Sequence, residues 1–375
     1  MSVDAAGEEG TDQTFEAYER SDRGVGVRNN VLVLPSVICS HIVAERIADR
    51  VDGAVSAPHD HGCAQIGADN DQTERTFVGL AQNPNVAGTV VVGLGCEHVQ
   101  SDEVAALMTE TGVPVRETAI QDAGGTDECM AEGVALAEGL IEDAKTTQRR
   151  AATLGDLTVG VVTSDADPTS VETADPLVGE FVRSVVDAGG RVLAAGTERV
   201  VPHREAALEA ATDGAADDLA TLIDEQSQYP ARTTRVGREA AETSFESVTR
   251  AWGGLPVRDV VPYGAVASHD RGLALVDAPS RFEEAATGLV AAGAQVVVHV
   301  TADGIPSGHP VAPVVKVSGD ESTVAALPDD IDVDATAADA ATLRETVRRV
   351  ADGDPSAADR HGLTEFAITR VGPSL

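Results

Sequence analysis

Short apolar runs alternate with amphipathic stretches along most of the chain. Runs of β-branched and aliphatic residues without polar interruption are typical of strands buried on both faces of a sheet, and the stretches between them have helical periodicity. In the first part of the chain, strands are predicted at residues 31–38, 53–58, 88–95 and 113–120. Helices are predicted at residues 41–51, at about 69–81 and at about 127–145.

A polar stretch at residues 145–156 interrupts this pattern and predicts a domain boundary. Further strands are predicted beyond it, at residues 157–164, 191–196, 259–264, 273–279, 295–301 and 313–319. Strands that alternate with helices indicate parallel βα units. We therefore predict an α/β protein with two Rossmann-like domains, each an open, mostly parallel sheet flanked by helices. The predicted limits are a disordered acidic tail at 1–14, a first domain at 15–148 and a second domain at 149–375.

The net charge of −35 narrows the classes of function. Only two lysines occur, Lys145 and Lys316, and the acidic residues are spread along the whole chain. Such a surface repels nucleic acid and anionic lipid, so neither is an expected partner. A halophilic cell with molar internal salt explains the charge, because salt screens the self-repulsion. Without a membrane-spanning stretch or a secretory signal, the expected location is the cytoplasm.

All four cysteines follow predicted strands of the first domain. The carboxyl ends of parallel strands meet at one edge of a sheet, where open α/β sheets bind ligands. Thiols, imidazoles and a carboxylate are therefore expected in one crevice, and such groups suit a divalent transition metal. The groups that follow the four strands in turn are Cys39 with His41, then His59, His61 and Cys63, then Cys96, Glu97 and His98, and finally Cys129.

Packing alone explains some of these residues. A free cysteine often behaves as a small buried apolar residue, so Cys39 and Cys129 are interpreted as core or helix-start residues. His41 and His98 fit ordinary polar positions in loops. The H-x-H-x-C run at residues 59–63 is different, because three coordinating side chains so close together are hard to explain by packing. Its spacing matches no standard zinc finger, and disulfides are not expected in a reducing cytoplasm.

Several long motifs resemble the altronate and galactarate dehydratase family, over about residues 15–335. The motifs are "FEAYERSDRGVGVRNNVLVLPSVIC", "HDHGCAQIGADNDQTERTFVGLAQNPNVAGTVVVGLGCE", "IQDAGGT", "GLALVDAPSRFEEAATGLVAAGAQVVVHVTADGIPSGHPVAPVVKVSG" and "PDDIDVDA". The resemblance implies a metal-dependent enzyme, usually with iron or manganese, that removes water from a sugar acid to give a 2-keto-3-deoxy acid. The metal would stabilise the enediolate, and a general acid would protonate the leaving hydroxyl.

The resemblance also implies roles for particular residues. The implied metal ligands are His61, Cys63 and Cys96, and the implied catalytic residues are His59, His61, Glu97 and His309. The implied substrate-binding residues are Arg28, Asn29, Gln65, Gly124, Gly125, Thr126, Asp303 and Ser307.

Structural alternatives stand beside three of these assignments. Arg28 could form a structural ion pair instead of binding a substrate carboxylate. Gly124 and Gly125 could form a simple helix-entry turn, with Thr126 as the N-cap. The loop at 301–310 could be a stiff connection. Lys316, which lies within a matched motif, is a further residue worth testing, and a buried ion pair would explain it too.

The chain departs from the family pattern in its second half. Relatives have a Cys-Gly-Gly-Ser-Asp loop followed by Ala-Asn-Pro, whereas residues 163–176 read "TSDADPTSVETADP", with Thr163 in place of the cysteine. The segment "VGREAAETSFES" lacks the lysine of relatives. Asp303 and His309 replace an arginine and an asparagine. The second domain's part of the site is therefore expected to be rebuilt.

Three functions remain open at this stage. The first is the large component of a sugar-acid dehydratase, and the second is a metal-dependent hydrolase that cleaves a C–C bond of a diketo sugar acid. The third is a non-catalytic scaffold subunit, which the retention of "HDHGC" and "GLGCE" argues against. Many relatives carry a small N-terminal domain before this region, so a separately encoded small subunit is an expected partner. A homo-oligomer is compatible with the sequence.

Overall fold

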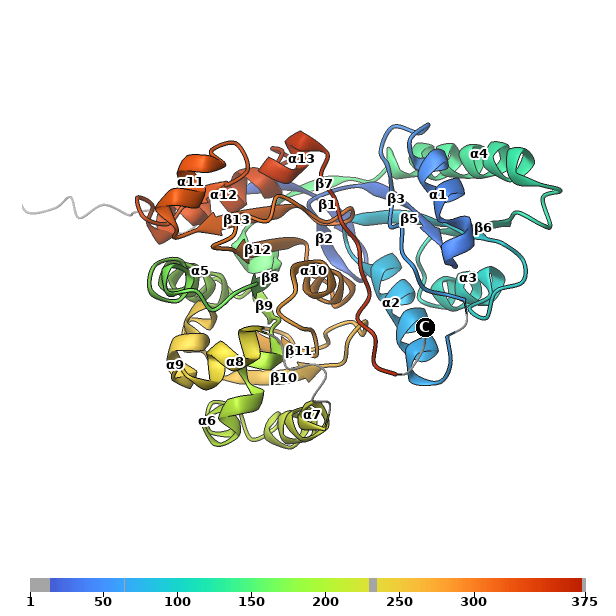
Figure 1. Ribbon diagram of the computed structural model, residues 1–375. Helices are drawn as coiled ribbons and strands as arrows, with labels where there is room; N and C mark the ends of the chain where they lie inside the picture. The colour runs from blue at the N-terminus through green and yellow to red at the C-terminus, as the bar shows by residue number, and fades with distance from the viewer. Residues whose placement is uncertain (1–13, 64, 229–234, 373–375) are drawn as a thin grey trace, which may run out of the picture.

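A computed structural model describes residues 14–63, 65–228 and 235–372, which form two lobes (Figure 1). The first lobe contains a four-stranded sheet of order β4-β3-β5-β6, in which all neighbouring strands are parallel. Its strands are β3 (Asn30–Pro35), β4 (Ala54–Ser56), β5 (Val86–Gly93) and β6 (Val115–Ala119). Its helices are α1 (His41–Ala48), α2 (Ala68–Gln82), α3 (Ser101–Glu110) and α4 (Thr126–Ala144).

Side chains of β3 alternate between the two faces of this sheet. Val31 and Val33 pack in a core with residues of α1 and α4, whereas Leu32 and Leu34 pack in a different core with residues of α2 and α3. Because successive side chains of a strand point to opposite faces, an uninterrupted apolar run serves both cores. The sequence prediction of strands buried on both faces is therefore confirmed here.

The second lobe contains a seven-stranded sheet of order β10-β11-β9-β8-β12-β13-β14, again with parallel neighbours. Its strands are β8 (Thr158–Thr163), β9 (Arg191–Ala194), β10 (Val257–Val261), β11 (Gly272–Val276), β12 (Val296–Val300), β13 (Val314–Ser318) and β14 (Val333–Asp334). Its helices are α5 (Asp175–Asp187), α6 (Arg204–Glu209), α7 (Ala216–Ser227), α8 (Arg235–Ala241), α9 (Phe245–Val248), α10 (Phe282–Ala291), α11 (Glu321–Ala326), α12 (Ala340–Ala351) and α13 (Ala357–His361). The predicted α/β class with two parallel sheets is confirmed.

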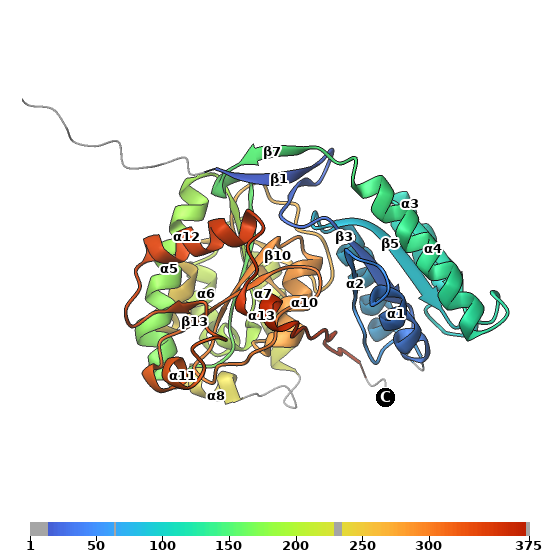
Figure 2. The same cartoon turned by 90° about the horizontal axis from the view of Figure 1, so that it is seen from above.

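A small antiparallel sheet, which the sequence pattern did not predict, spans the two lobes (Figure 2). Its order is β2-β1-β7, with β1 (Phe15–Arg20), β2 (Gly24–Gly26) and β7 (Arg149–Ala152). The polar stretch predicted as a boundary thus contains a strand. Phe15, at the start of β1, packs in the core of the second lobe, so the segment assigned to the first domain begins against the other lobe.

The lobes share one apolar core, which fixes their relative position. Leu34 and Phe77 of the first lobe belong to the same cluster as Tyr263 and Phe282 of the second. The backbones approach closely at Gly79, where an added Cβ would lie 2.4 Å from the carbonyl oxygen of Gly264. A close-packed apolar interface of this kind resists rearrangement, so a cavity between the lobes has defined walls. Among the described helices, none is both long and apolar enough to cross a membrane.

Asp175, at the start of α5, is a fully buried carboxyl group whose ionisation destabilises the fold. Burial raises its pKa to about 6, against attraction by Arg199. Thr163 donates a 2.8 Å hydrogen bond to Oδ1, and within the described chain Oδ2 has no hydrogen-bond partner. The folded protein therefore favours the protonated acid, and its stability falls as the pH rises from 4 through 6.

Replacing the acid by its neutral amide, Asp175→Asn, should raise the free energy of unfolding by about 2 kcal/mol at pH 7. The gain should vanish near pH 4, where the wild-type acid is already protonated. Urea unfolding at both pH values measures this difference. An equal effect at the two pH values would contradict the assignment of the gain to ionisation.

Candidate functional site

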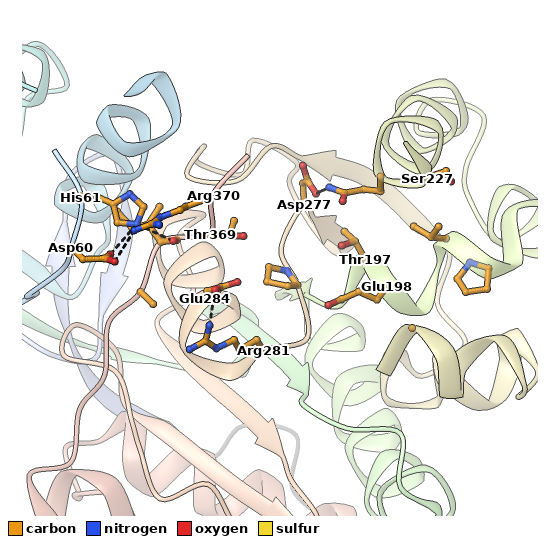
Figure 3. A pocket seen from close by; sticks show the side chains of 17 residues that line it. Asp60, His61, Thr197, Glu198, Ser227, Asp277, Arg281, Glu284, Thr369 and Arg370 are labelled. Atoms are coloured by element: carbon orange, nitrogen blue, oxygen red, sulfur yellow. Dashed lines mark hydrogen bonds and ion pairs between the residues drawn. The ribbon is translucent and has the colours of Figure 1, made fainter. Parts of the chain in front are cut away.

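A cavity of about 820 Å³ lies between the lobes (Figure 3). Its walls come from the loop after β4 in the first lobe, from the loops after β9 and β11 and the helices α7, α8 and α10 in the second lobe, and from the C-terminal segment. The polar side chains on these walls are Asp60, His61, Thr197, Glu198, Gln226, Ser227, Asp277, Arg281, Glu284, Thr369 and Arg370. Carboxylates, arginines, hydroxyls and an amide in one hollow can bind a ligand that carries both hydroxyl and carboxylate groups.

A smaller cavity of about 290 Å³ adjoins the first and shares Glu198 and Arg281 with it. Ser164 and Asp165 line it from the end of β8, and Asp303 lines it from the loop after β12. The order of the sheet reverses at β8, because β9 lies on one side and β12 on the other. Open α/β sheets bind ligands at this switch point. The loops that depart from the family pattern therefore line the cavity at the switch point.

The predicted meeting of loops at the carboxyl edge of the first sheet is observed. The Ile38 amide donates to the His61 carbonyl at 2.9 Å, and the Val99 amide donates to the Gly62 carbonyl at 3.5 Å. Gly62 has a φ of 87°, and an added Cβ would lie 2.0 Å from the carbonyl oxygen of Ser36. Only glycine permits this backbone approach.

His59 holds this loop to the sheet. Its Nε2 donates to the Pro35 carbonyl at 2.6 Å, and its Nδ1 accepts from the His61 amide at 3.1 Å. The ring packs against Phe77 and Phe366. Burial lowers the pKa of His59 to about 4, so the ring is neutral and both nitrogens are occupied. These contacts place His59 behind the wall of the large cavity, which it does not line. Its predicted catalytic role stays a prediction.

His61 lies on the wall of the large cavity, as does its neighbour Asp60 (Figure 3). Its Nδ1 accepts from the Gln65 side chain at 2.6 Å, and its Nε2 donates to the carbonyl of Ile368 at 3.1 Å. Burial lowers its pKa, against the attraction of Asp60. Gln65 is itself buried and also accepts from the Gly62 amide, so it orients His61 and does not line either cavity.

Glu97 organises the loop after β5. Its carboxylate accepts hydrogen bonds from the amides of Leu94, Gly95 and Cys96 at 2.7 to 3.1 Å and from the Ser36 hydroxyl at 2.9 Å. Burial alone would raise the pKa of Glu97, but these hydrogen bonds outweigh it and lower the pKa. A carboxylate with four donors has little capacity left for proton transfer, so these contacts favour a structural role for Glu97, and its catalytic role stays a prediction.

Replacing Glu97 by glutamine should lower the free energy of unfolding by about 2 kcal/mol. The amide group of Glu97→Gln turns an N–H₂ donor toward backbone donors, and those buried N–H groups lose their partner. Urea unfolding at pH 7 measures the loss, with Glu110→Gln at the exposed end of α3 as the matched control. A loss no larger than that of the control would show that the loop does not depend on this carboxylate.

The predicted ligands do not form a metal site in this arrangement. Cys63 and Cys96 are exposed, the Cys96 thiol lies 3.7 Å from the Gln121 amide, and both nitrogens of His61 are hydrogen-bonded. In the described ranges, no group of three or more His, Cys, Asp or Glu residues is placed to hold a metal ion. The donor set therefore does not fit a metal as it stands. Iron or manganese stays a prediction from the resemblance, and no chemical step below passes through it.

The two remaining cysteines match their structural interpretation. Cys39 lies in a short 3-10 turn directly before α1, and Cys129 is buried inside α4. Burial raises the pKa of the Cys129 thiol, against the hydrogen bond from Thr118.

Arg28 and Asn29 lie before β3, at the opposite edge of the sheet from the converging loops. Arg28 donates to the Val350 carbonyl at 2.8 Å and pairs with Asp359 at 3.3 Å, which is the structural ion pair considered above. Asn29 donates to the Ala144 carbonyl at 2.9 Å. The structure therefore separates both residues from the two cavities described above.

Gly124, Gly125 and Thr126 form the turn that leads into α4. The glycines have φ values of 93° and 138°, which a residue with a side chain adopts with difficulty. Gly125 occupies the N-cap, with Thr126 as the first helical residue, so the expectation that Thr126 is the N-cap is wrong by one position. This turn follows the edge strand β6 and lines neither cavity.

The loop at residues 301–310 is divided between the cavity and the interior. Asp303 is exposed on the wall of the smaller cavity, whereas Ser307 and His309 are buried and line neither cavity. His309 accepts from the Val311 amide at 3.2 Å, and burial lowers its pKa to about 3. Lys316 is buried below the loop and donates to the carbonyl of Pro306. The loop is thus held from below by a lysine.

The C-terminal segment closes one side of the large cavity, which the sequence pattern did not indicate. It runs from the second lobe to the first (Figure 2). Tyr263 donates to the Ala367 carbonyl at 3.3 Å, Arg370 pairs with Asp60 at 2.8 Å, and Asp69 accepts from the Gly372 amide at 2.8 Å. These contacts place the Arg370 guanidinium at the cavity.

Glu198 is a second residue that sequence reasoning missed. It follows β9 and accepts from both the amide and the hydroxyl of Ser280, at 2.8 and 3.1 Å. Burial raises the pKa of Glu198, against these hydrogen bonds and the attraction of Arg199. Its position after a predicted strand could have marked Glu198 as a candidate site residue, and the same holds for Asp277 after β11. The abundance of acidic residues concealed both.

Comparison with known proteins identifies the family. Residues 17–145 match the second domain of the D-galactarate dehydratase/altronate hydrolase family, and residues 239–374 match the C-terminal domain of D-galactarate/altronate dehydratases. Altronate dehydratase of Bacillus subtilis is 28% identical, over 97% of this chain and 79% of that protein. The altronate dehydratase of Escherichia coli is 26% identical over 97% and 79%.

A third relative has a different name. The (2R)-sulfolactate sulfo-lyase subunit beta of Chromohalobacter salexigens is 27% identical, over 96% of this chain and 98% of that subunit. The two domain matches together cover more than two thirds of the chain, from the first lobe to the C-terminal segment. The chain therefore belongs to the altronate/galactarate dehydratase family.

Proposed function

We propose that this chain is the large component of a hydro-lyase that removes water from a sugar acid in the cavity between the lobes. The observation that carries the proposal is the composition of that cavity. Its walls combine arginines, carboxylates, hydroxyls and an amide, and they come from both family-matched regions and from the segment between them, which supplies Glu198 and Gln226. The names of the relatives support a lyase, and the two altronate dehydratases support a sugar acid as substrate.

The two ends of the cavity differ in chemistry. In Figure 3, Arg370 lies beside His61 and Asp60 at one end, Arg281 and Glu284 lie in the middle part, and Ser227 lies toward the other end. A guanidinium group binds a carboxylate through parallel hydrogen bonds. The Asp277 carboxylate and the Gln226 amide also line the cavity and can accept from or donate to the hydroxyls of a sugar chain. The cavity thus suits a polyhydroxy acid.

Glu198 supplies the proton-transfer group of the proposal. Elimination breaks the C–H bond next to the carboxylate, and that proton passes to an ionised carboxylate of the cavity wall such as Asp277. It also breaks the C–O bond at the following carbon, and the leaving hydroxyl departs as water once it gains a proton. A buried carboxyl with a raised pKa keeps a larger protonated fraction near neutral pH and can give that proton. The resulting enol then converts to the 2-keto acid. Nearby positive charge of Arg281 would stabilise the negative charge that develops on the substrate.

A separately encoded small subunit is part of the proposal. The match to the sulfo-lyase covers 98% of a protein that is named a subunit, whereas the matches to altronate dehydratases cover 79% of each. Supplying the small region of an altronate dehydratase as a second polypeptide should then raise turnover. Equal turnover with and without it would contradict this part of the proposal.

A panel of acids tests the function directly. The purified chain, with the presumed partner, is incubated with altronate, galactarate, sulfolactate and a diketo sugar acid in molar KCl, with Fe²⁺ or Mn²⁺ or with a chelator. Formation of a 2-keto acid is followed with a carbonyl reagent, and water loss is confirmed by mass spectrometry. We expect a 2-keto product from a sugar acid. Cleavage of a diketo acid to pyruvate would support the hydrolase alternative, and no reaction with any acid would support the scaffold.

A further inference from the structure

The smaller cavity contains a hydroxyl that is held from behind by a buried histidine. Ser164 follows β8 directly, and its amide donates to the Val300 carbonyl of β12 at 3.1 Å, which continues the pairing of the two central strands. His299 of β12 lies 2.9 Å from the Ser164 hydroxyl through Nε2. Neither residue has an assigned role in the proposed elimination. Both lie at the switch point of the sheet.

The His299 ring is held firmly. It is completely buried and stacks on Phe282, with ring centroids 4.2 Å apart and planes inclined by 19°. Stacked rings of this kind lose little freedom when a ligand binds, because the ring is already immobile. The opposite nitrogen, Nδ1, has no hydrogen-bond partner among the described residues.

The direction of the hydrogen bonds follows from the donors and acceptors present. The Ser164 hydroxyl donates to the Val300 carbonyl at 3.3 Å, so Nε2 of His299 donates to the serine oxygen. Burial, together with the charge of Lys316, lowers the pKa of His299 to about 3, so the ring is neutral. In this tautomer Nδ1 carries a lone pair, which costs less to leave unpaired than a buried N–H group. One lone pair of the Ser164 oxygen then remains for a ligand.

We propose that Ser164 accepts a hydrogen bond from a substrate hydroxyl in the smaller cavity, and that His299 is the positioning residue that fixes the serine for this contact. Ser164 shares the cavity wall with Arg281 and Glu198, which also line the large cavity. The ligand class is therefore a hydroxy acid whose carboxylate is bound by an arginine and whose hydroxyl reaches Ser164. The inference rests on the proposed function for its substrate class.

Binding of altronate and galactarate is measured by calorimetry beside turnover, so that the two proposals can fail separately. Ser164→Ala should weaken binding, and raise KM, by about tenfold with kcat changed far less, since one hydrogen bond to a neutral group is lost. Ser184→Ala removes a half-buried hydroxyl that bonds within α5, and as the matched control it should leave the affinity unchanged. A 2-keto-3-deoxy or deoxy analogue without the contacted hydroxyl should bind wild type and Ser164→Ala equally.

Two histidine variants separate positioning from packing. His299→Gln keeps an N–H donor and should retain most of the affinity. His299→Phe keeps the stacking on Phe282, loses the donor, and should reproduce the tenfold loss of Ser164→Ala. Unchanged affinity in His299→Phe and Ser164→Ala would overturn the inference. If the wild-type protein binds an acid without turnover, the proposed function fails, but the affinities of the variants still test the role of Ser164 and His299. If the wild-type protein binds none of these acids, the inference fails as well.

Discussion

Lowering the pH from 7 to 4 should unfold this protein steeply, because three histidines are neutral and buried. His59 has a pKa of about 4, and His299 and His309 have pKa values of about 3, all lowered first by burial. In the unfolded chain each would bind a proton near pH 6.5. The unfolded state therefore binds more protons below that pH, and the stability that these rings contribute above pH 6.5 is lost as the pH falls.

The expected slope is large. Each histidine contributes up to about 1.4 kcal/mol per pH unit between its unfolded and folded pKa, so three give about 4 kcal/mol per unit between pH 6 and pH 4. Asp175 acts in the opposite sense in the same range, because its raised pKa favours the folded state at low pH, and it removes about 1.4 kcal/mol per unit. Urea unfolding in molar KCl at pH 7, 6, 5 and 4 measures the sum.

Variants assign the slope to particular rings. His309→Gln lacks the titrating ring and should reduce the pH slope of the free energy of unfolding by about one proton. It should also lower the free energy of unfolding at pH 7, but by less than the amount that protonation of His309 removes between pH 7 and pH 4. His361→Gln, at the exposed end of α13, is the matched control and should leave the slope unchanged. A slope below one proton in the wild-type protein would show that the rings titrate with ordinary pKa values in the folded state.

Removing the acid in Glu198→Gln should lower kcat by about 10² to 10⁴, the usual contribution of a positioned general acid. Glutamine keeps the size of the side chain and can still accept from Ser280, so the cavity should retain its shape and KM should change little. Activity of the wild-type enzyme should fall as the pH rises through the raised pKa of Glu198, since the donor must be protonated. This alkaline limb should be absent in the variant's residual activity.

The matched comparison is Glu284→Gln, which changes a carboxylate on the same cavity wall. Glu284 pairs with Arg281 at 3.2 Å and has no part in the proposed proton transfer, so its loss should raise KM and leave kcat and the alkaline limb largely intact. Steady-state kinetics from pH 5 to 9 with the best acid of the panel separates the two roles. Identical kinetic effects of both substitutions would remove the assignment of Glu198 as proton donor.

Hydrophobic periodicity determined most of the fold. Uninterrupted apolar runs such as the one at β3 predicted the parallel strands, because a strand covered on both faces needs apolar side chains on both. The hydrophobic pattern did not predict the short strands β1, β2 and β7, since they are partly polar and the pairing of β1 with β7 joins residues that are far apart in the chain. Their formation depends on the placement of both lobes rather than on any local pattern.

For the candidate site, the sequence by itself determined which loops meet in the first lobe, because parallel strands align their carboxyl ends whatever their side chains are. Only the tertiary structure decided which side chains reach the cavity. It places Glu97 among backbone donors and Arg28 at the opposite edge, and it brings Glu198 and Arg370 together with His61 across the space between the lobes. The relative positions of Glu198, Arg370 and His61 are set by the packing of α2 against α10 and by the path of the C-terminal segment. No local pattern of residues encodes either of these.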